Sequence, residues 1–155
     1  MKRFGHSFVV DADIDKVWKF YTDINHLKII TPKKMHLEIL KTTHEFIEEG
    51  TEVWLRANLI TDSRWHSKIT HLKPYEYTDE MISGRFKIWN HLHKFDKIDN
   101  TKTEIIDQID FQLPYGVLGR LFENYVIFVL SKIFEYRKRE TAKMLDDHRS
   151  SSLDS

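Results

Sequence analysis

Two hydrophobic patterns in succession restrict the fold of this chain more than any other feature. From residue 35 to 113, apolar and polar side chains alternate, as in the run Val53, Leu55, Ala57 and Leu59. This period of two is typical of strands with one buried face, and the short breaks at Gly50 and elsewhere predict antiparallel hairpins. From 116 to 147 the period becomes helical, which predicts one long helix of roughly 48 Å. A sheet and a helix that each have one apolar face must bury those faces against each other.

The residues before this region predict one strand and two short helices. Residues 4–10 are typical of a strand, and Asp11 or Asp13 is suited to cap a helix over 14–21. A second short helix is expected near 23–30, and it must end before Pro32. The predicted fold class is α+β, with a curved seven-stranded antiparallel sheet around a long C-terminal helix and two short helices after strand 1.

Length and composition indicate a single domain. A chain of 155 residues fits one domain, expected at 1–149, and the polar stretch 150–155 is expected to be a disordered tail. Lys+Arg and Asp+Glu both number 24, and this balance argues against nucleic-acid binding. The absence of cysteine excludes disulfides and thiol chemistry. No secretory signal and no run of about 18 apolar residues is present, so we expect a cytoplasmic protein without stable membrane insertion.

The long helix is expected to pack with one apolar stripe. The spacing places these residues near one face: Leu118, Phe122, Tyr125, Val129, Ile133, Tyr136 and Met144. Val126, Ile127 and Leu130 are then left over, to pack within the domain on the two short helices, to face a second subunit in a homodimer, or to touch a lipid surface. Residues 135–149, including the basic run at 137–139, are mostly charged and are expected to be solvated.

A polar cluster interrupts the inward face of the predicted sheet. Trp89, His91, His93 and Phe95 share one strand face, and pairing Phe95 with Thr103 would place His91 opposite Asp107. One interpretation is that His91 and Asp107 orient a ligand, or act as a catalytic acid–base pair. The other is a structural His–Asp hydrogen bond, since buried polar groups need partners whatever the function.

A metal interpretation of the same residues is weaker. His91 and His93 could be two zinc ligands and Asp107 the third, but no further ligand motif accompanies them. We therefore expect neither a metal nor a cofactor. The predicted binding site contains the polar residues Asp79, His91, His93 and Asp107. It also contains apolar residues that could equally be plain core, namely Leu55, Trp65, Ile69, Met81, Trp89, Tyr125 and Val129.

Three stretches resemble the helix-grip superfamily, also called SRPBCC or START-like, which includes the birch-pollen allergen, lipid-transfer domains and polyketide cyclases. They are 17–32, then 65–95 with its Trp89-to-Phe95 segment, and Asp107 followed by 113–119. The resemblance covers about residues 3–147 and is strongest to a branch described as cyclase/dehydrase-like. It implies a cavity between the sheet and the long helix.

The sequence leaves three functions open. The leading hypothesis is binding of a hydrophobic or aromatic small molecule, lipid-like or polyketide-like, in that cavity. The second is a polyketide cyclase or dehydratase in which His91 and Asp107 act as acid and base. The third is a protein-interaction domain whose cavity is vestigial.

Overall fold

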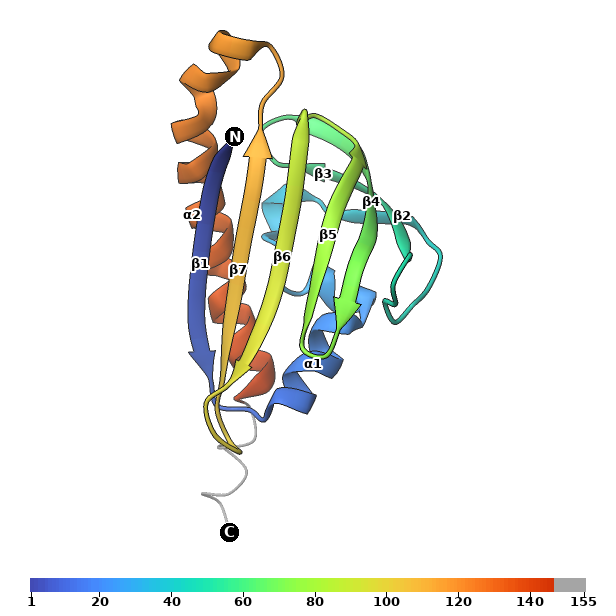
Figure 1. Ribbon diagram of the computed structural model, residues 1–155, viewed down its shortest axis with the longest axis vertical. Helices are drawn as coiled ribbons and strands as arrows, with labels where there is room; N and C mark the ends of the chain where they lie inside the picture. Colours follow the sequence, from blue (N-terminus) through green and yellow to red (C-terminus); the bar gives the residue numbers. More distant parts are fainter. Residues whose placement is uncertain (147–155) are drawn as a thin grey trace.

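The computed structural model describes residues 1–146 and has the predicted order of elements (Figure 1). Along the chain these are β1 (Lys2–Val10), α1 (Ile14–Thr22), the 3₁₀ helices η1 (Ile24–Lys28) and η2 (Lys33–Met35), β2 (Glu38–Thr42), β3 (Glu52–Asn58), β4 (Asp62–Lys73), β5 (Glu76–Ser83), β6 (Ile88–Lys97), β7 (Thr103–Gln112) and α2 (Gly116–Leu145). The predicted tail at 150–155, and the end of the predicted domain beyond 146, lie outside the described residues.

The seven strands form one antiparallel sheet in the order β1-β7-β6-β5-β4-β3-β2. Successive strands from β2 to β7 are neighbours, as short hairpin connections require, and β1 pairs with β7 at the other edge. Both α1 and α2 lie against the same face of this sheet (Figure 1). The α+β helix-grip prediction is therefore confirmed.

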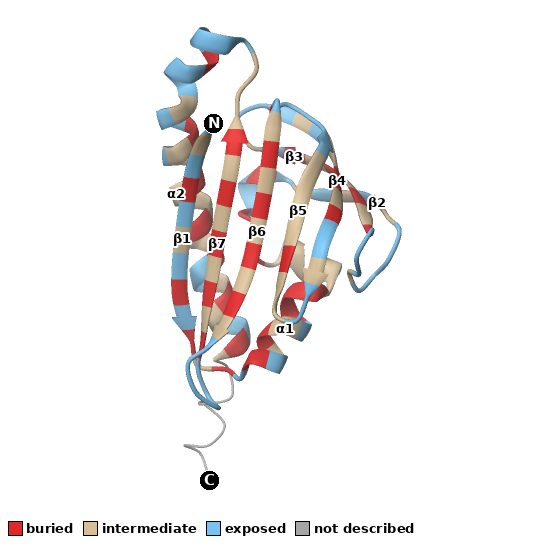
Figure 2. Cartoon of the chain, viewed as in Figure 1, coloured by how far each residue is buried: buried red, intermediate tan, exposed pale blue. Residues whose placement is uncertain are grey.

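Burial alternates along the neighbouring strands β6 and β7. From Trp89 to Phe95 in β6 and throughout β7, every second residue is buried, and these are the odd-numbered ones (Figure 2). The odd face carries Trp89 and Phe95 from β6 and Ile105, Ile109 and Phe111 from β7. The prediction that this face points inward is confirmed, and the polar residues that share it are consequently buried.

Local capping and backbone conformation shape the connection from β1 to β2. Asp13 caps α1 by accepting a hydrogen bond of 3.0 Å from the Lys16 amide. The second short helix is a 3₁₀ turn, not an α-helix, and the chain bends at Thr31 before Pro32. The period of two was expected from residue 35, but the strand begins only at Glu38 because His36 has a left-handed backbone, with φ of 48°.

The turn into α2 depends on close backbone approach. Tyr115 and Gly116 have positive φ angles of 70° and 54°. Three residues later, a Cβ on Gly119 would collide with the Pro114 carbonyl oxygen and press on Leu113. Only glycine lets the first turn of α2 fold back this tightly over the end of β7.

The buried stripe of α2 is not the predicted one. It consists of Gly119, Val126, Leu130, Phe134, Arg137, Thr141 and Leu145. Val126 and Leu130, expected to be left over, pack in the core with Phe4, Trp89 and Phe111. The expectation of a solvated C-terminal part was wrong for Arg137, which is only 7% exposed.

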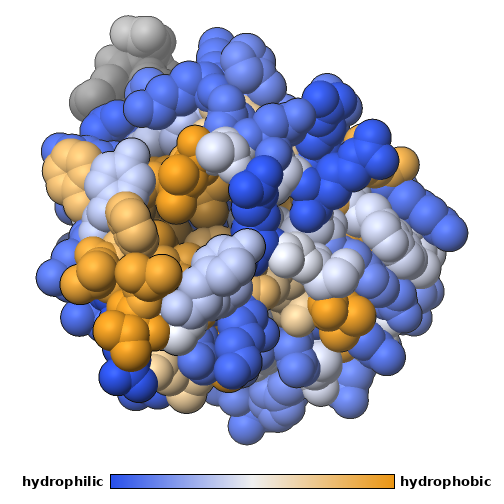
Figure 3. Space-filling view, turned by 90° about the horizontal axis from the view of Figure 1, so that it is seen from above, coloured by the Kyte–Doolittle hydropathy of each residue, from blue (hydrophilic) through white to orange (hydrophobic). Residues whose placement is uncertain are grey.

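The beginning of α2 exposes most of its large apolar side chains. These are Val117, Leu118, Leu121, Phe122, Tyr125 and Phe128, preceded by Tyr115, and each is at least half exposed. Figure 3, which looks down on this end of the molecule, shows hydrophobic side chains gathered on the surface. Among residues 1–146, no helix combines the length and the apolar character needed to cross a membrane.

Candidate functional site

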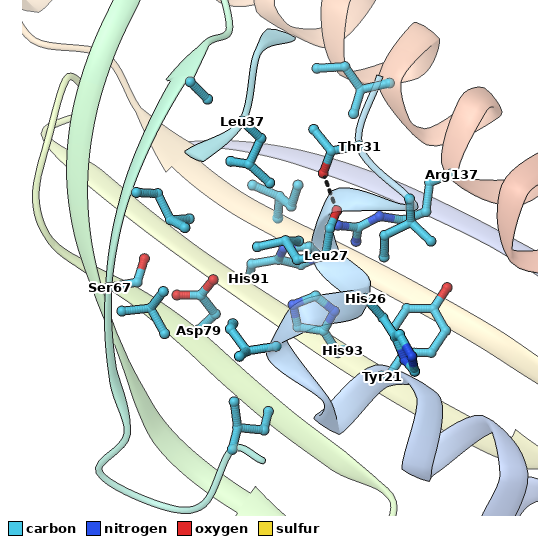
Figure 4. Close-up of a pocket in the computed structure, with 18 of the residues that line it drawn as sticks. Tyr21, His26, Leu27, Thr31, Leu37, Ser67, Asp79, His91, His93 and Arg137 are labelled. Carbon is cyan, nitrogen blue, oxygen red and sulfur yellow. Dashed lines mark hydrogen bonds between the residues drawn. The ribbon is translucent and has the colours of Figure 1, made fainter. Parts of the chain in front are cut away.

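A cavity of about 150 Å³ lies between the sheet and α2, and the two 3₁₀ helices help to close it (Figure 4). Its wall is mostly apolar and includes Leu55, Ile69, Trp89, Leu130 and Phe134. The polar residues Tyr21, Ser67, Asp79, His91, His93 and Arg137 also line it. An apolar pocket with a few polar side chains is the usual form of a small-molecule site.

His91 and Asp107 form a short polar contact between β6 and β7. His91 Nε2 and Asp107 Oδ1 are 2.8 Å apart, and both residues are at most 5% exposed. The predicted register was wrong by two residues, because His93, not His91, lies opposite Asp107, and Phe95 lies opposite Ile105. The His91–Asp107 bond forms along the diagonal between the strands.

Asp107 Oδ1 is shared by two further groups. His93 Nδ1 lies 3.1 Å from it, without the alignment of a hydrogen bond, and Arg137 Nη1 lies 3.5 Å from it. The His91 and His93 rings have centroids 3.6 Å apart. One carboxylate oxygen on β7 is therefore in contact with two imidazoles from β6 and a guanidinium from α2.

This environment determines the charge of the cluster. Burial would raise the pKa of Asp107, but the contacts with His91 and His93 and the positive charge of Arg137 outweigh it and hold the pKa well below its usual range. Burial lowers the pKa of His91 despite its bond to Asp107. Burial and the neighbouring His91 lower the pKa of His93 to about 4. Near neutral pH the imidazoles are neutral, Asp107 is ionised and Arg137 is charged.

Two tyrosines support the cluster from the side of α1. The Tyr77 ring stacks on His93 with centroids 4.3 Å apart, and the Tyr77 hydroxyl donates to the Tyr21 carbonyl oxygen. The Tyr21 hydroxyl lies 3.0 Å from Thr141 Oγ1 on α2. Burial raises the pKa of both phenols, so they remain neutral. These contacts hold β5, α1 and α2 in fixed relation around the imidazoles.

Asp79 brings a second carboxyl group to the cavity. It lies directly opposite His91 in the β5–β6 pairing, and its Oδ1 is buried without a hydrogen-bond partner among the described residues. Burial raises the pKa of this carboxyl, which favours its neutral form. Asp79 therefore lies on the strand next to the histidines and lines the same cavity.

His91, His93 and Asp107 also have the donor atoms that a metal ion requires. Their ligand atoms lie within 4.8 Å of one another. However, the oxygen nearest both imidazoles already accepts from His91, and the Arg137 guanidinium lies 3.5 Å from it. A fixed positive charge at this distance opposes a second cation, so the geometry favours a hydrogen-bonded cluster over a metal centre.

The structure brings most, but not all, of the predicted site residues together. Those that line the cavity are Leu55, Trp65, Ile69, Asp79, Trp89, His91 and His93. Asp107 does not line the cavity but contacts both histidines, and Met81 packs against the core cluster around Trp89. Tyr125 is 52% exposed, and neither it nor Val129 is part of the cavity wall.

Sequence reasoning missed Arg137, Tyr21 and Ser67 as cavity residues. The signal for Arg137 was its position in the spacing Val126, Leu130, Phe134, Arg137, which is one helical stripe. The adjacent charges Lys138 and Arg139 concealed it, because a run of three basic residues is usually a solvated face.

Comparison with known proteins supports the fold and no more than the fold. No family model and no curated protein sequence matches the chain. Among solved structures, a START superfamily protein from Mycobacterium smegmatis aligns with a TM-score of 0.73 at 9% identity, covering 94% of this chain and 97% of that one. Norcoclaurine synthase from Thalictrum flavum aligns with 0.72 at 14% identity, covering 96% of both chains. An aromatase/cyclase from a Streptomyces species aligns with 0.67 at 15% identity, covering 98% and 95%. The chain therefore has the START-like helix-grip fold.

Proposed function

We propose that this protein binds a small hydrophobic or aromatic molecule in the cavity between the sheet and α2. The observation that carries the proposal is the pairing of an apolar wall with buried polar side chains that line the same space (Figure 4). His91 and His93 orient the ligand, and Trp65 and Trp89 contribute aromatic surface.

The size of the cavity limits the ligand. A cavity of about 150 Å³ is comparable to one engineered in another protein, which binds benzene. A molecule with a single ring, or a larger one with a single ring inserted, therefore suits this conformation. Lipid-like or polyketide-like ligands fit only if the long part extends out of the cavity.

Filling the cavity tests the proposal. Ala57 is buried and lines the space, so Ala57→Phe should remove binding of a one-ring probe such as indole. Val9→Phe adds the same side chain at a position 51% exposed on β1 and serves as the matched control. We expect calorimetry to show indole binding to the unmodified protein and to Val9→Phe, and none to Ala57→Phe. Equal binding by all three would place the probe elsewhere and contradict the proposal.

The His91–Asp107 hydrogen bond favours a second candidate, a cyclase or dehydratase. A neutral imidazole held by a carboxylate can remove a proton next to a carbonyl group, and a second imidazole can donate to the enolate that forms. The structurally similar aromatase/cyclase and norcoclaurine synthase have this fold as enzymes. His91 would act as the base and His93 as the donor.

Hydrogen–deuterium exchange of a bound ketone separates this candidate from simple binding. An enzyme should accelerate deuterium uptake at the carbon next to the carbonyl of acetophenone in D₂O, as followed by NMR. His91→Gln should abolish the acceleration, and His36→Gln, at an exposed histidine, should keep it. No acceleration by the unmodified protein, or full acceleration by His91→Gln, would remove His91 as the base.

A further inference from the structure

Arg137 is the charged residue in the otherwise uncharged buried stripe of α2. It lies between Phe134 and Thr141 on that stripe and is 7% exposed. Its guanidinium carbon lies 4.8 Å from the centre of the Phe134 ring, which is the geometry of a cation–π contact. The residue also lines the cavity (Figure 4). A permanent positive charge is therefore placed at the wall of the proposed binding site.

The hydrogen-bonding capacity of this guanidinium is largely unused. Arginine has five N–H donors and cannot lose its charge in a protein. Within the described part of the chain, its one polar contact is the 3.5 Å approach of Nη1 to Asp107 Oδ1, and the buried Nε has no partner. A buried N–H donor without an acceptor is costly, so the guanidinium favours an additional acceptor in the cavity beyond those that residues 1–146 provide.

Asp107 satisfies only one of the guanidinium donors, and through a long contact. Its Oδ1 is engaged by His91 at 2.8 Å, with His93 at 3.1 Å, and its Oδ2 makes no hydrogen bond within residues 1–146. A bidentate Arg–carboxylate pair would use both oxygens at about 2.7–2.9 Å. The Arg137–Asp107 contact is single and longer, so the fork of the guanidinium remains available to a ligand.

Resting on the proposed function, we infer that the ligand is a small carboxylic acid whose carboxylate binds Arg137 while its ring or short chain fills the apolar part of the cavity. A planar carboxylate matches the donor fork of arginine. A phosphate monoester fits less well, because it carries about −1.5 to −2 charges. The cavity offers one buried cation, and Asp107 already offsets part of it.

Binding of such an acid should be coupled to uptake of a proton. The bound carboxylate would face Arg137 from α2, His91 and His93 from β6, Asp107 from β7, Asp79 and Tyr77 from β5, Tyr21 from α1 and His26 from η1. A second anion beside Asp107 favours protonation of a neutral imidazole in this group. Calorimetry in buffers of different ionisation enthalpy should therefore detect proton uptake with benzoate and none with benzamide.

Benzoate and benzamide are matched probes for this inference, since they differ in charge but hardly in size. We expect the unmodified protein to bind benzoate at least about tenfold more tightly than benzamide, and more tightly than phenyl phosphate. Arg137→Gln should lose this preference and retain benzamide binding. Arg139→Gln, at an exposed arginine of the same helix, should keep the preference.

The comparison of probes on the unmodified protein does not depend on any variant folding. Equal or tighter binding of benzamide would overturn the inference and leave the proposed function standing. Tighter binding of phenyl phosphate would overturn the assignment of the acid as a carboxylate. If neither benzoate, benzamide nor indole binds, the proposed function itself is contradicted.

Discussion

The two parts of α2 differ in which side chains they bury. The first part, residues 116–125, exposes Val117, Leu118, Leu121 and Phe122 to solvent. The second part, residues 126–145, buries the cation Arg137 and the hydroxyl of Thr141. Apolar character therefore does not decide burial along this helix. The position of each segment relative to the sheet decides it, because only the second part lies over the cavity and its polar cluster.

Both parts of α2 differ from an ordinary core, in which apolar side chains are buried and charged ones are exposed. A buried arginine with a single long hydrogen bond and an exposed run of large apolar side chains are both unusual in a stable domain. The proposed ligand would supply further acceptors to the first. The second marks the surface at which the homodimer that the sequence left open can be tested.

The largest difference in stability is expected between alanine variants of two phenylalanines in α2. Phe134 is 3% exposed and contacts Phe4 and His91, whereas Phe122 is 61% exposed. Phe134→Ala should lower the free energy of unfolding by about 3–5 kcal/mol, and Phe122→Ala should change it by no more than about 0.5 kcal/mol. Urea unfolding measures both. Similar losses would mean that the two parts of α2 are equally packed.

The buried ion pair should show strong coupling. Asp107→Leu should cost about 3–5 kcal/mol because it leaves Arg137 buried without an anion. Adding Arg137→Met should restore most of this stability, since the charge is removed as well. A double-mutant cycle by urea unfolding gives the coupling. Additive losses in the double variant would show that the two charges do not interact.

Protonation of His93 should lower the stability of the folded protein in acid. The pKa of His93 is lowered to about 4 in the folded protein and is about 6.5 when unfolded, so the unfolded chain takes up the proton first. The free energy of unfolding should decrease as the pH falls from about 6.5 to about 4, by an amount on the order of 3 kcal/mol. His93→Gln should flatten this dependence, and the exposed control His36→Gln should not.

The smallest effect on stability is expected at the exposed start of α2. Leu121 is 72% exposed, so Leu121→Lys should change the free energy of unfolding by less than about 0.5 kcal/mol. If a homodimer uses this surface, its association constant should fall in the same variant, as measured by sedimentation. A monomeric unmodified chain would contradict the homodimer.

The sheet and its inward face could be predicted because a period of two is unambiguous in strands. His91 and His93 alternate with Asn90 and Leu92, so their common face followed directly from the sequence. The register was harder. β6 continues to Lys97, and Asp99 accepts a hydrogen bond from the Thr101 amide in a tight loop. The connection is therefore shorter than the predicted one, and the pairing moves by two residues while the same face stays buried.

The orientation of α2 could not be predicted in the same way. Residues 125–130 are apolar on every side, so hydropathy there is compatible with several faces. The buried face is selected by tertiary contacts, with Val126 and Leu130 packing against the aromatic residues of the sheet. The same rotation of the helix buries Arg137, and for this reason the cation of the site was not predicted.

The most direct test of the central claim is an NMR measurement of the imidazole nitrogens at about pH 6. His93, whose pKa is lowered to about 4, should be neutral. The resonances of His91 and His93 should shift when indole is added, while those of the exposed His36 and His44 should not. A charged imidazole at His93, with the resonances of both histidines unaffected by indole, would show that these side chains do not line a ligand site.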